Sequence, residues 1–238
     1  MIDLGGQDGA PVLGLGGGMF KASIILFDTQ PGTKQFTVPE GVKKIRAFVV
    51  GAGGLGGGGY SEKVIDVVTG QVFSYTVGAG SSYPVSGSTS SFGGLISATG
   101  GSTAGGVGTG GDVNFTGGNG TKRDSSITFN AGASAANRYE NGKDGDYSVG
   151  SAAYCSGASF PSVNSIDGWG LGMPPGSYGW GAFAEYDTSH GSGVLLATMG
   201  GGGSNKIGHS GIPGIGGGAS SNNSVKGGNG AVGVEVLA

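Results

Sequence analysis

The stretch RAFVVGAGGLG, Arg46–Gly56, decides how the rest of the chain is interpreted. Small and branched apolar residues lead into glycines spaced G-x-G-x-x-G. In a dinucleotide-binding fold, glycines with this spacing form the turn between a strand and a helix, and the N-terminus of that helix binds a pyrophosphate. Here three further glycines follow, and each costs a helix about 1 kcal/mol relative to alanine. The acidic residue that would hold the ribose is also missing, because no Asp or Glu stands between Asp66 and Asp112. We therefore expect a strand that continues as an extended glycine tract, without a nucleotide site.

Glycine dominates the composition, with 59 of 238 residues. Against the usual share of roughly 7%, a glycine motif carries little information on its own, and the same spacing recurs at residues 106–111. Valine and isoleucine outnumber leucine, and β-branched side chains favour strands. The composition predicts an all-β fold, a sandwich or barrel of short strands with glycine-rich, polyglycine-II-like loops and packing layers. Either dense backbone hydrogen bonding or subunit contacts are expected to offset the entropy lost by glycine.

Charge and cysteine content exclude several classes of protein. The net charge is only −3, so the chain lacks the high charge of a disordered protein, and it has no basic patch for nucleic acid. Cys155 is the single cysteine, which rules out an internal disulfide. The first eighteen residues lack the pattern of an export signal, and there is no apolar run long enough to span a bilayer. We expect neither nucleic-acid binding nor membrane insertion.

Alternating apolar residues predict the individual strands. Phe36 and Val38 alternate before a turn at Pro39–Gly41, and Ile45, Ala47 and Val49 then share one face, opposite Lys44 and Arg46. Residues 60–68 and 71–77 flank a Thr-Gly turn and are expected to form a hairpin. Further strands are expected at residues 23–27, 91–98, 113–116, 127–129, 194–199 and in the final AVGVEVLA.

Five segments are informative when they are taken together in the order in which they occur: FTVPEGVKKIRAFVVGAGG, GGYSEKVIDVVTGQVFSYTVGAG, SSFGGLISATGG, GGDVNFTGGNG and GGNGAVGVEVLA. This succession resembles the glycine-rich domains at the ends of tailed-bacteriophage tail fibres, over residues 34–120 and the C-terminal strand. A looser similarity connects it to the tip adhesins of T-even-type phages, in which glycine-rich motifs scaffold variable loops. Residues 1–31 are expected to be an N-terminal attachment segment, and residues 32–238 a receptor-binding domain with an aromatic variable insert at about 121–190.

The resemblance implies a function and partners. The resemblance implies that the protein is a virion tail-fibre or tail-tip adhesin, which binds a host surface receptor that is either a glycan or an outer-membrane protein. It also implies contacts with other virion tail proteins and a homotrimer as a candidate assembly. The alternative is a purely structural virion protein, such as a fibre connector or head decoration, without receptor binding.

Residues 154–186 stand out because they contain both tryptophans and several other aromatic residues among Ser, Asn and Gly. Rigid aromatic rings on loops of this composition supply contact area at low entropic cost. Candidate receptor contacts in this stretch are Trp169, Tyr178, Trp180 and Tyr186. The alternative for Trp169, Trp180 and the neighbouring Phe183 is a small core beneath the loops.

A second candidate patch lies at residues 121–148, where Tyr139 is the proposed receptor contact. Lys122, Arg123 and Arg138 could bind an acidic glycan, and the alternative is an ordinary solvated loop.

The chain gives little support for catalysis, and we expect no enzyme, no cofactor and no metal. His190 and His209 are the only histidines, and paired cysteines are absent. Two carboxylate pairs have the residue types of a glycosidase, Glu185 with Asp187 and Glu140 with Asp144, but the sequence does not give their separation. The run Asp144–Asp146 shares two acids with a calcium loop, and a turn explains it equally well.

Overall fold

Three antiparallel sheets make up the computed structural model, which describes residues 24–82, 84–120, 129–131, 133–145, 147–148, 204–206, 209–210, 215–218 and 226–237. The described residues contain strands and no helix, so the all-β prediction is confirmed. The first sheet has the order β1 (Ile24–Asp28), β14 (Ala231–Val236), β3 (Lys44–Val50), β4 (Tyr60–Asp66), β9 (Val113–Phe115). The second has the order β2 (Gly32–Thr37), β5 (Val72–Val77), β6 (Ser90–Phe92), β7 (Ile96–Ala98), β8 (Gly108–Thr109). The third joins β11 (Tyr147–Ser148), β10 (Phe129–Ala131), β12 (Ser204–Lys206) and β13 (His209–Ser210).

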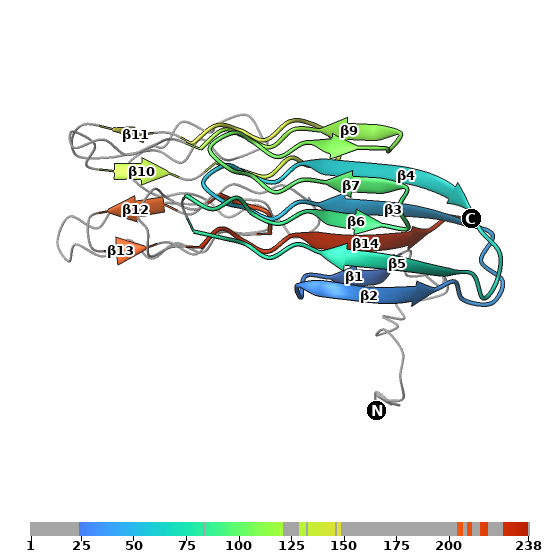
Figure 1. Cartoon of the computed structure of the whole chain (residues 1–238). Helices are drawn as coiled ribbons and strands as arrows, with labels where there is room; N and C mark the ends of the chain where they lie inside the picture. Colours follow the sequence, from blue (N-terminus) through green and yellow to red (C-terminus); the bar gives the residue numbers. More distant parts are fainter. Residues whose placement is uncertain are drawn as a thin grey trace, which may run out of the picture.

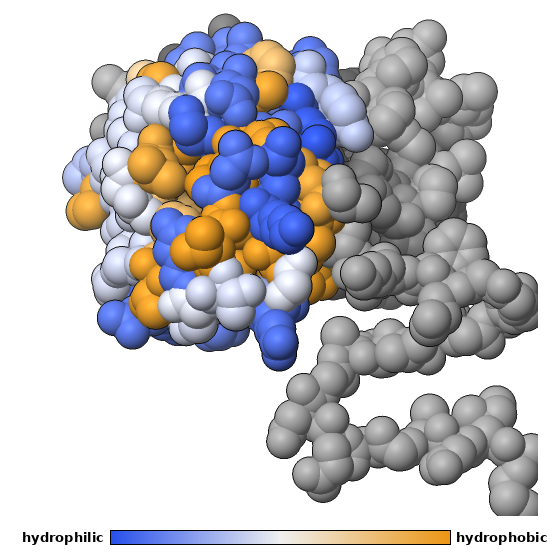
Figure 2. Space-filling view, turned by 90° about the vertical axis from the view of Figure 1, so that its right-hand side faces the viewer, coloured by the Kyte–Doolittle hydropathy of each residue, from blue (hydrophilic) through white to orange (hydrophobic). Residues whose placement is uncertain are grey.

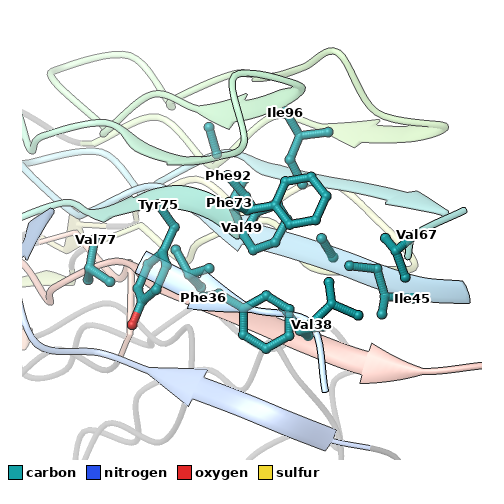
Figure 3. Packing of buried hydrophobic residues seen from close by; sticks show 14 residues of the cluster. Phe36, Val38, Ile45, Val49, Val67, Phe73, Tyr75, Val77, Phe92 and Ile96 are labelled. Carbon is teal, nitrogen blue, oxygen red and sulfur yellow. The ribbon is translucent and has the colours of Figure 1, made fainter. Parts of the chain in front are cut away.

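The two five-stranded sheets pack face to face around one apolar core (Figures 1 and 3). Of the two predicted architectures, sandwich and barrel, the structure is therefore a sandwich. The first sheet contributes the alternate residues Ile45, Ala47 and Val49, as the sequence predicts, together with Val232 and Val234 of β14. The second sheet contributes aromatic rings, with Phe36, Phe73 and Phe92 at its centre. The rings of Phe73 and Phe92 stack at 5.1 Å between centroids. Alternation along each strand thus produces a single buried face per sheet.

Both predicted turns are present, and each has a glycine where the backbone requires one. Gly41 and Gly70 have φ angles of 78° and 79°, a left-handed conformation that residues with a Cβ rarely adopt. Their amide groups are paired as well: Gly41 N donates to Thr69 Oγ1 at 3.3 Å, and Gly70 N donates to Val38 O at 2.9 Å.

The predicted hairpin between residues 60–68 and 71–77 is wrong. β4 pairs with β3 and β9 in the first sheet, whereas β5 pairs with β2 and β6 in the second. The turn at Thr69–Gly70 therefore carries the chain from one sheet to the other. An alternating pattern shows that a strand has one buried face, but both sheets bury their faces in the same core, so the pattern does not choose the partner.

One other strand prediction needs adjustment. Residues 91–98 form two strands, because the chain reverses at Gly93 and Gly94, whose φ angles are 61° and 67°. Of the strand expected at 127–129, Phe129 belongs to β10, and residues 127 and 128 lie outside the described residues, as do residues 194–199. The strands expected at 23–27, at 113–116 and in AVGVEVLA are found as β1, β9 and β14.

The sandwich has two distinct ends. β1 begins beside the end of β14, where Ile24 is paired with Glu235, and Figure 1 shows the C-terminus at this end. The four short strands of the third sheet lie at the opposite end of the molecule (Figure 1). β1 is an edge strand of the first sheet, so residues 24–28 of the expected leading segment 1–31 belong to the sandwich.

Asp28 joins the two sheets at the edge formed by β1 and β2. Its Oδ2 accepts hydrogen bonds from Lys34 Nζ at 2.6 Å and from the Tyr75 hydroxyl at 3.0 Å. Burial by itself would raise the pKa of Asp28, but hydrogen bonds from Lys34, the Gln30 amide and Tyr75 outweigh it and hold the pKa below its usual value. Burial and the bond to Asp28 raise the pKa of Tyr75 to about 12.

These contacts predict an acid-dependent contribution to stability. Because the folded-state pKa of Asp28 is lowered, its contribution is present above the unfolded pKa of about 4 and is lost as the pH falls through the lower folded value. We expect Asp28→Asn to lower the free energy of unfolding at pH 7 by about 1 kcal/mol, and the difference from the wild type to shrink below pH 4. Urea unfolding of both proteins between pH 2.5 and 7 measures this. An unchanged difference at every pH would contradict the assignment.

The opening stretch continues from β3 into a glycine loop that is buried along its whole length. Residues 51–59 connect β3 to β4, and Leu55 near the middle is 1% exposed. Buried loops are rare, because their amide and carbonyl groups need partners. Here the partners are other glycine-rich segments: Gly53 N donates to Gly228 O at 2.8 Å, Gly57 N to Gly118 O at 3.0 Å and Gly58 N to Gly216 O at 2.7 Å.

We call this assembly the glycine bundle, made of residues 51–59 and the segments that surround them: 78–82, 84–88, 99–106, 117–120, 133–136, 216–218 and 227–230. Backbone packs directly on backbone within it. A Cβ atom on Gly57 would overlap the carbonyl of Ser134, and one on Gly101 would overlap the carbonyl of Gly56. The dense backbone hydrogen bonding expected from the sequence is confirmed, and it explains why so many glycines are required.

Candidate functional site

The described part of the expected variable insert includes one segment that folds onto the sandwich, residues 133–145, which we call the Tyr139 loop. Its beginning belongs to the glycine bundle, where Gly118 N donates to Ser134 O at 3.0 Å. Ala135 and Ala136 are buried against Phe48 and Tyr60, on the outer face of the first sheet. The loop therefore covers part of a sheet face that alternation directs away from the main core.

Four charged side chains form a closed ring beneath the loop. Arg138 Nε donates to Glu62 Oε2 at 2.6 Å, and its Nη2 donates to Glu235 Oε1 at 3.1 Å. Arg46 completes the ring: its Nη1 donates to Glu235 Oε2 at 2.9 Å, and its Nε lies 3.8 Å from Glu62 Oε1. Glu62 and Glu235 are 8% and 7% exposed, so two buried carboxylates are balanced by two guanidinium groups.

Register explains why three members of this charge ring meet. Arg46 of β3 stands directly opposite Glu235 of β14, and Glu62 of the neighbouring β4 lies opposite Phe48. All three point away from the main core because they alternate with its residues. Arg138 is the fourth member and the one that comes from outside the sheet, so it fastens the Tyr139 loop to the sandwich.

Aromatic residues complete the surroundings of Arg138. Its guanidinium lies 5.9 Å from the centre of the Phe48 ring, and the Tyr60 hydroxyl donates to Glu62 Oε2 at 2.6 Å. Burial and the neighbouring Glu62 raise the pKa of Tyr60 well above its ordinary value. Burial alone would lower the pKa of Arg138, but Tyr60 and Glu62 outweigh it and raise this pKa as well.

Tyr139 follows directly and is 73% exposed, which is the highest value among the large hydrophobic side chains of the described residues. A rigid turn holds its backbone: Asn137 is 1% exposed, and its Oδ1 accepts hydrogen bonds from the amides of Tyr139 at 2.8 Å and Glu140 at 3.3 Å. An aromatic ring exposed on a fixed backbone is the arrangement that binding loops use for rigid contacts. Tyr139 is thus an exposed aromatic side chain on a hydrogen-bonded turn, and its role as a receptor contact stays a prediction.

The other candidate contacts, Trp169, Tyr178, Trp180 and Tyr186, lie outside the described residues, as do Lys122 and Arg123. The described residues that flank the aromatic stretch are Ser148 at the end of β11 and Ser204 at the start of β12. Both belong to the third sheet, at the end of the molecule opposite the C-terminus (Figure 1).

The patch at residues 121–148 was expected to contact an acidic glycan or to be a solvated loop, but the Arg138 side chain itself does not extend into solvent. Its side chain is 20% exposed and points inward to Glu62 and Glu235. The sequence did contain a signal for this role. Arg46 and the glutamates occupy positions that alternate with core residues, so a charged surface on the first sheet was predictable, although its partner in the loop was not.

The proposed carboxylate pair Glu140 and Asp144 has structural partners. Glu140 Oε2 accepts from Lys143 Nζ at 3.3 Å, and Asp144 Oδ1 accepts from the amide of Asn119 at 2.7 Å. Asp146, Glu185, Asp187 and His190 lie outside the described residues. Within the described ranges, no group of three His, Cys, Asp or Glu side chains could hold a metal ion. The same ranges contain no helix long and apolar enough to cross a membrane.

No protein-family model matches the chain, and a search of curated proteins finds no similar sequence. The class of protein therefore follows from the fold and the site: an all-β sandwich extended by a glycine bundle, with a clamped loop that exposes one aromatic ring.

Proposed function

We propose that the protein is a non-enzymatic bacteriophage tail-fibre or tail-tip adhesin that binds a host surface receptor. The observation that carries the proposal is the Tyr139 loop, in which an aromatic ring exposed to 73% stands on a backbone fixed by Asn137 and Arg138. A fixed backbone lowers the entropy lost on binding, so a clamped loop favours affinity. If the loop were ordered only to stabilise the fold, the Tyr139 ring would not need to face solvent.

The layout of the molecule supports the same function. The strand that begins the described chain and the strand that ends it meet at one end of the sandwich, while the third sheet lies at the other (Figure 1). In an adhesin, the first end would join other tail proteins, and the host cell would be contacted by the third-sheet end and by the Tyr139 loop on the outer face of the first sheet. The receptor would be a surface glycan or an outer-membrane protein, and the protein would be a virion component that acts without nucleic acid or membrane insertion.

Adsorption measures this function directly. The fluorescently labelled full chain is mixed with a panel of bacterial strains, and bound protein is counted by flow cytometry. We expect saturable binding to a subset of strains and protection of those strains from a phage that uses the same receptor. Absence of binding to every strain, together with incorporation into virions, would instead support the structural alternative, a connector or decoration protein.

Tyr139→Ala separates binding from folding. Since the side chain is exposed, we expect the free energy of unfolding to stay within about 0.5 kcal/mol of the wild type, while cell binding weakens about tenfold. Val68→Ala is the matched control, because Val68 is 69% exposed on a turn of the sandwich, and it should change neither quantity. Equal binding by Tyr139→Ala and wild type would remove Tyr139 from the site.

The aromatic stretch is tested in the same assay by the triple variant Trp169→Ala, Tyr178→Ala, Trp180→Ala. Loss of binding with an unchanged thermal unfolding midpoint would support a contact role. Loss of both would assign these residues to a local core. Release of sugars from the polysaccharide of a binding strain, which we do not expect, would indicate an enzyme.

A further inference from the structure

Two charged side chains that follow Tyr139 in its loop form an ion pair at the surface. Glu140 is the next residue, and its Oε2 accepts a hydrogen bond from Lys143 Nζ at 3.3 Å. The side chains of Glu140 and Lys143 are 33% and 46% exposed, so this pair differs from the buried charge ring beneath the loop. The loop therefore presents an aromatic ring together with a carboxylate and an ammonium group.

Hydrogen bonds hold the backbone that carries this ion pair, as they hold the backbone of Tyr139. Glu140 O accepts a hydrogen bond from Asn137 N at 3.2 Å. Lys143 N donates to Ser134 Oγ at 2.8 Å, and Lys143 O accepts from Ser134 N at 3.0 Å. The ring and the two charged groups thus start from fixed backbone positions, which lowers the entropy lost when a ligand orders their side chains.

The ion pair keeps hydrogen-bonding capacity for a ligand. An ammonium group has three donors, and Lys143 uses one of them on Glu140. Within the described part of the chain, Glu140 Oε1 is buried without a hydrogen-bond partner, which is costly and rare in folded proteins. A role in ligand binding would account for a carboxylate that is retained at this cost.

The exposed apolar surface of the loop is small. Within residues 133–145, Tyr139 is the one large hydrophobic side chain that is exposed. A tyrosine buries about 150–250 Å², whereas a specific protein interface takes about 800 Å² from each partner and has clustered hot spots. The end of the sandwich near the C-terminus differs, because Val68 and Val72 are 69% and 52% exposed and several hydrophobic patches lie among hydrophilic residues there (Figure 2). A single ring with polar neighbours instead suits a ligand unit much smaller than a protein.

A sugar unit has the chemistry that these three groups complement. The carbon-bound hydrogens on one face of a hexose ring pack against the electron-rich face of a tyrosine, and sugar hydroxyls both donate and accept hydrogen bonds. One hydroxyl can donate to Glu140 Oε2 while its neighbour accepts from Lys143 Nζ, since these two atoms are 3.3 Å apart. Such bonds to ionised groups are the stronger class of hydrogen bond. An uncharged sugar fits best, because the ammonium group that would hold an acidic one is already paired with Glu140.

We propose that the Tyr139 loop binds a neutral hexose unit of a host surface glycan, with Tyr139 as the stacking platform and Glu140 and Lys143 as the hydrogen-bonding pair. This inference rests on the proposed function and narrows it, because that function leaves the choice between a glycan and an outer-membrane protein open.

Selective treatment of host cells distinguishes the two kinds of receptor. A strain that binds the labelled full chain is treated either with periodate, which cleaves the carbon–carbon bond between neighbouring sugar hydroxyls, or with a protease. We expect periodate to abolish binding and the protease to leave it unchanged. Binding that is lost after protease treatment would overturn the glycan assignment, while the adhesin function would stand. Absence of binding to every untreated strain would contradict the adhesin function and the glycan site with it.

Substitutions then test the contacts. Tyr139→Phe keeps the aromatic face and should bind within about twofold of the wild type, whereas Tyr139→Leu is apolar without that face and should bind about tenfold more weakly. Glu140→Gln removes the ionised acceptor and should also weaken binding about tenfold. Glu40→Gln makes the same change on an exposed turn of the sandwich and should bind like the wild type. Wild-type binding by Tyr139→Leu or by Glu140→Gln would overturn the assigned contacts.

Competition tests the charge of the sugar. Polysaccharide extracted from the binding strain should compete with the cells for the wild-type protein, and reduction of its carboxyl groups to alcohols should not weaken the competition. Loss of competition on reduction would show that an acidic sugar is bound and would overturn the neutral assignment.

Discussion

Gly57→Ala is expected to destabilise the protein by about 3 kcal/mol or more, although it adds a single methyl group. The new Cβ would overlap the carbonyl of Ser134, and that carbonyl accepts the hydrogen bond of Gly118 N at 3.0 Å. Backbone atoms that are hydrogen bonded on both sides cannot move aside as a flexible side chain can. Relief of the overlap requires separation of segments that the glycine bundle holds together.

The same substitution should affect the Tyr139 loop before it affects the sandwich, since Ser134 lies at the start of that loop. Urea unfolding measures the loss of stability, and hydrogen exchange shows whether residues 133–145 lose protection first. Thr103→Ala lies in a neighbouring segment of the bundle, removes side-chain atoms without adding any, and should cost less than about 0.5 kcal/mol. A Gly57→Ala protein as stable as this control would show that the packing is looser than described.

The alternation of apolar residues and the position of turn glycines were sufficient to predict most of the strands. In β3 and β14 the alternation of apolar residues fixes which side faces the core, and Gly41 and Gly70 mark turns through their backbone requirements. The glycine tract after Val50 was also correctly expected to continue as packed scaffold, because four successive glycines oppose a helix.

Long-range partners were not predictable in the same way. β4 and β5 are adjacent in sequence but belong to different sheets, and nothing in their own residues distinguishes the two pairings. Arg138 illustrates the same limit for the site. Its neighbours Glu62 and Glu235 are 76 and 97 residues away in sequence, so the ring depends on register and on the path of a glycine segment.

Arg138→Ala is expected to lower the free energy of unfolding by about 3 kcal/mol, because it leaves Glu62 and Glu235 buried with Arg46 as the remaining cation of the ring. It also removes the guanidinium beside Phe48. Urea unfolding at pH 7 provides the measurement. Lys143→Ala, which removes an exposed partner of Glu140 in the same loop, should cost less than about 1 kcal/mol.

A double variant tests whether uncompensated charge is the cause. In Arg138→Ala/Glu235→Gln the ring again has one carboxylate for one guanidinium, so we expect part of the lost stability to return. Cell binding should stay weak in both variants even though Tyr139 is retained, because the loop is no longer fastened to the first sheet. If Arg138→Ala bound cells like the wild type while its loop lost exchange protection, then the clamp would serve stability alone, and a fixed Tyr139 backbone would not be needed for receptor contact.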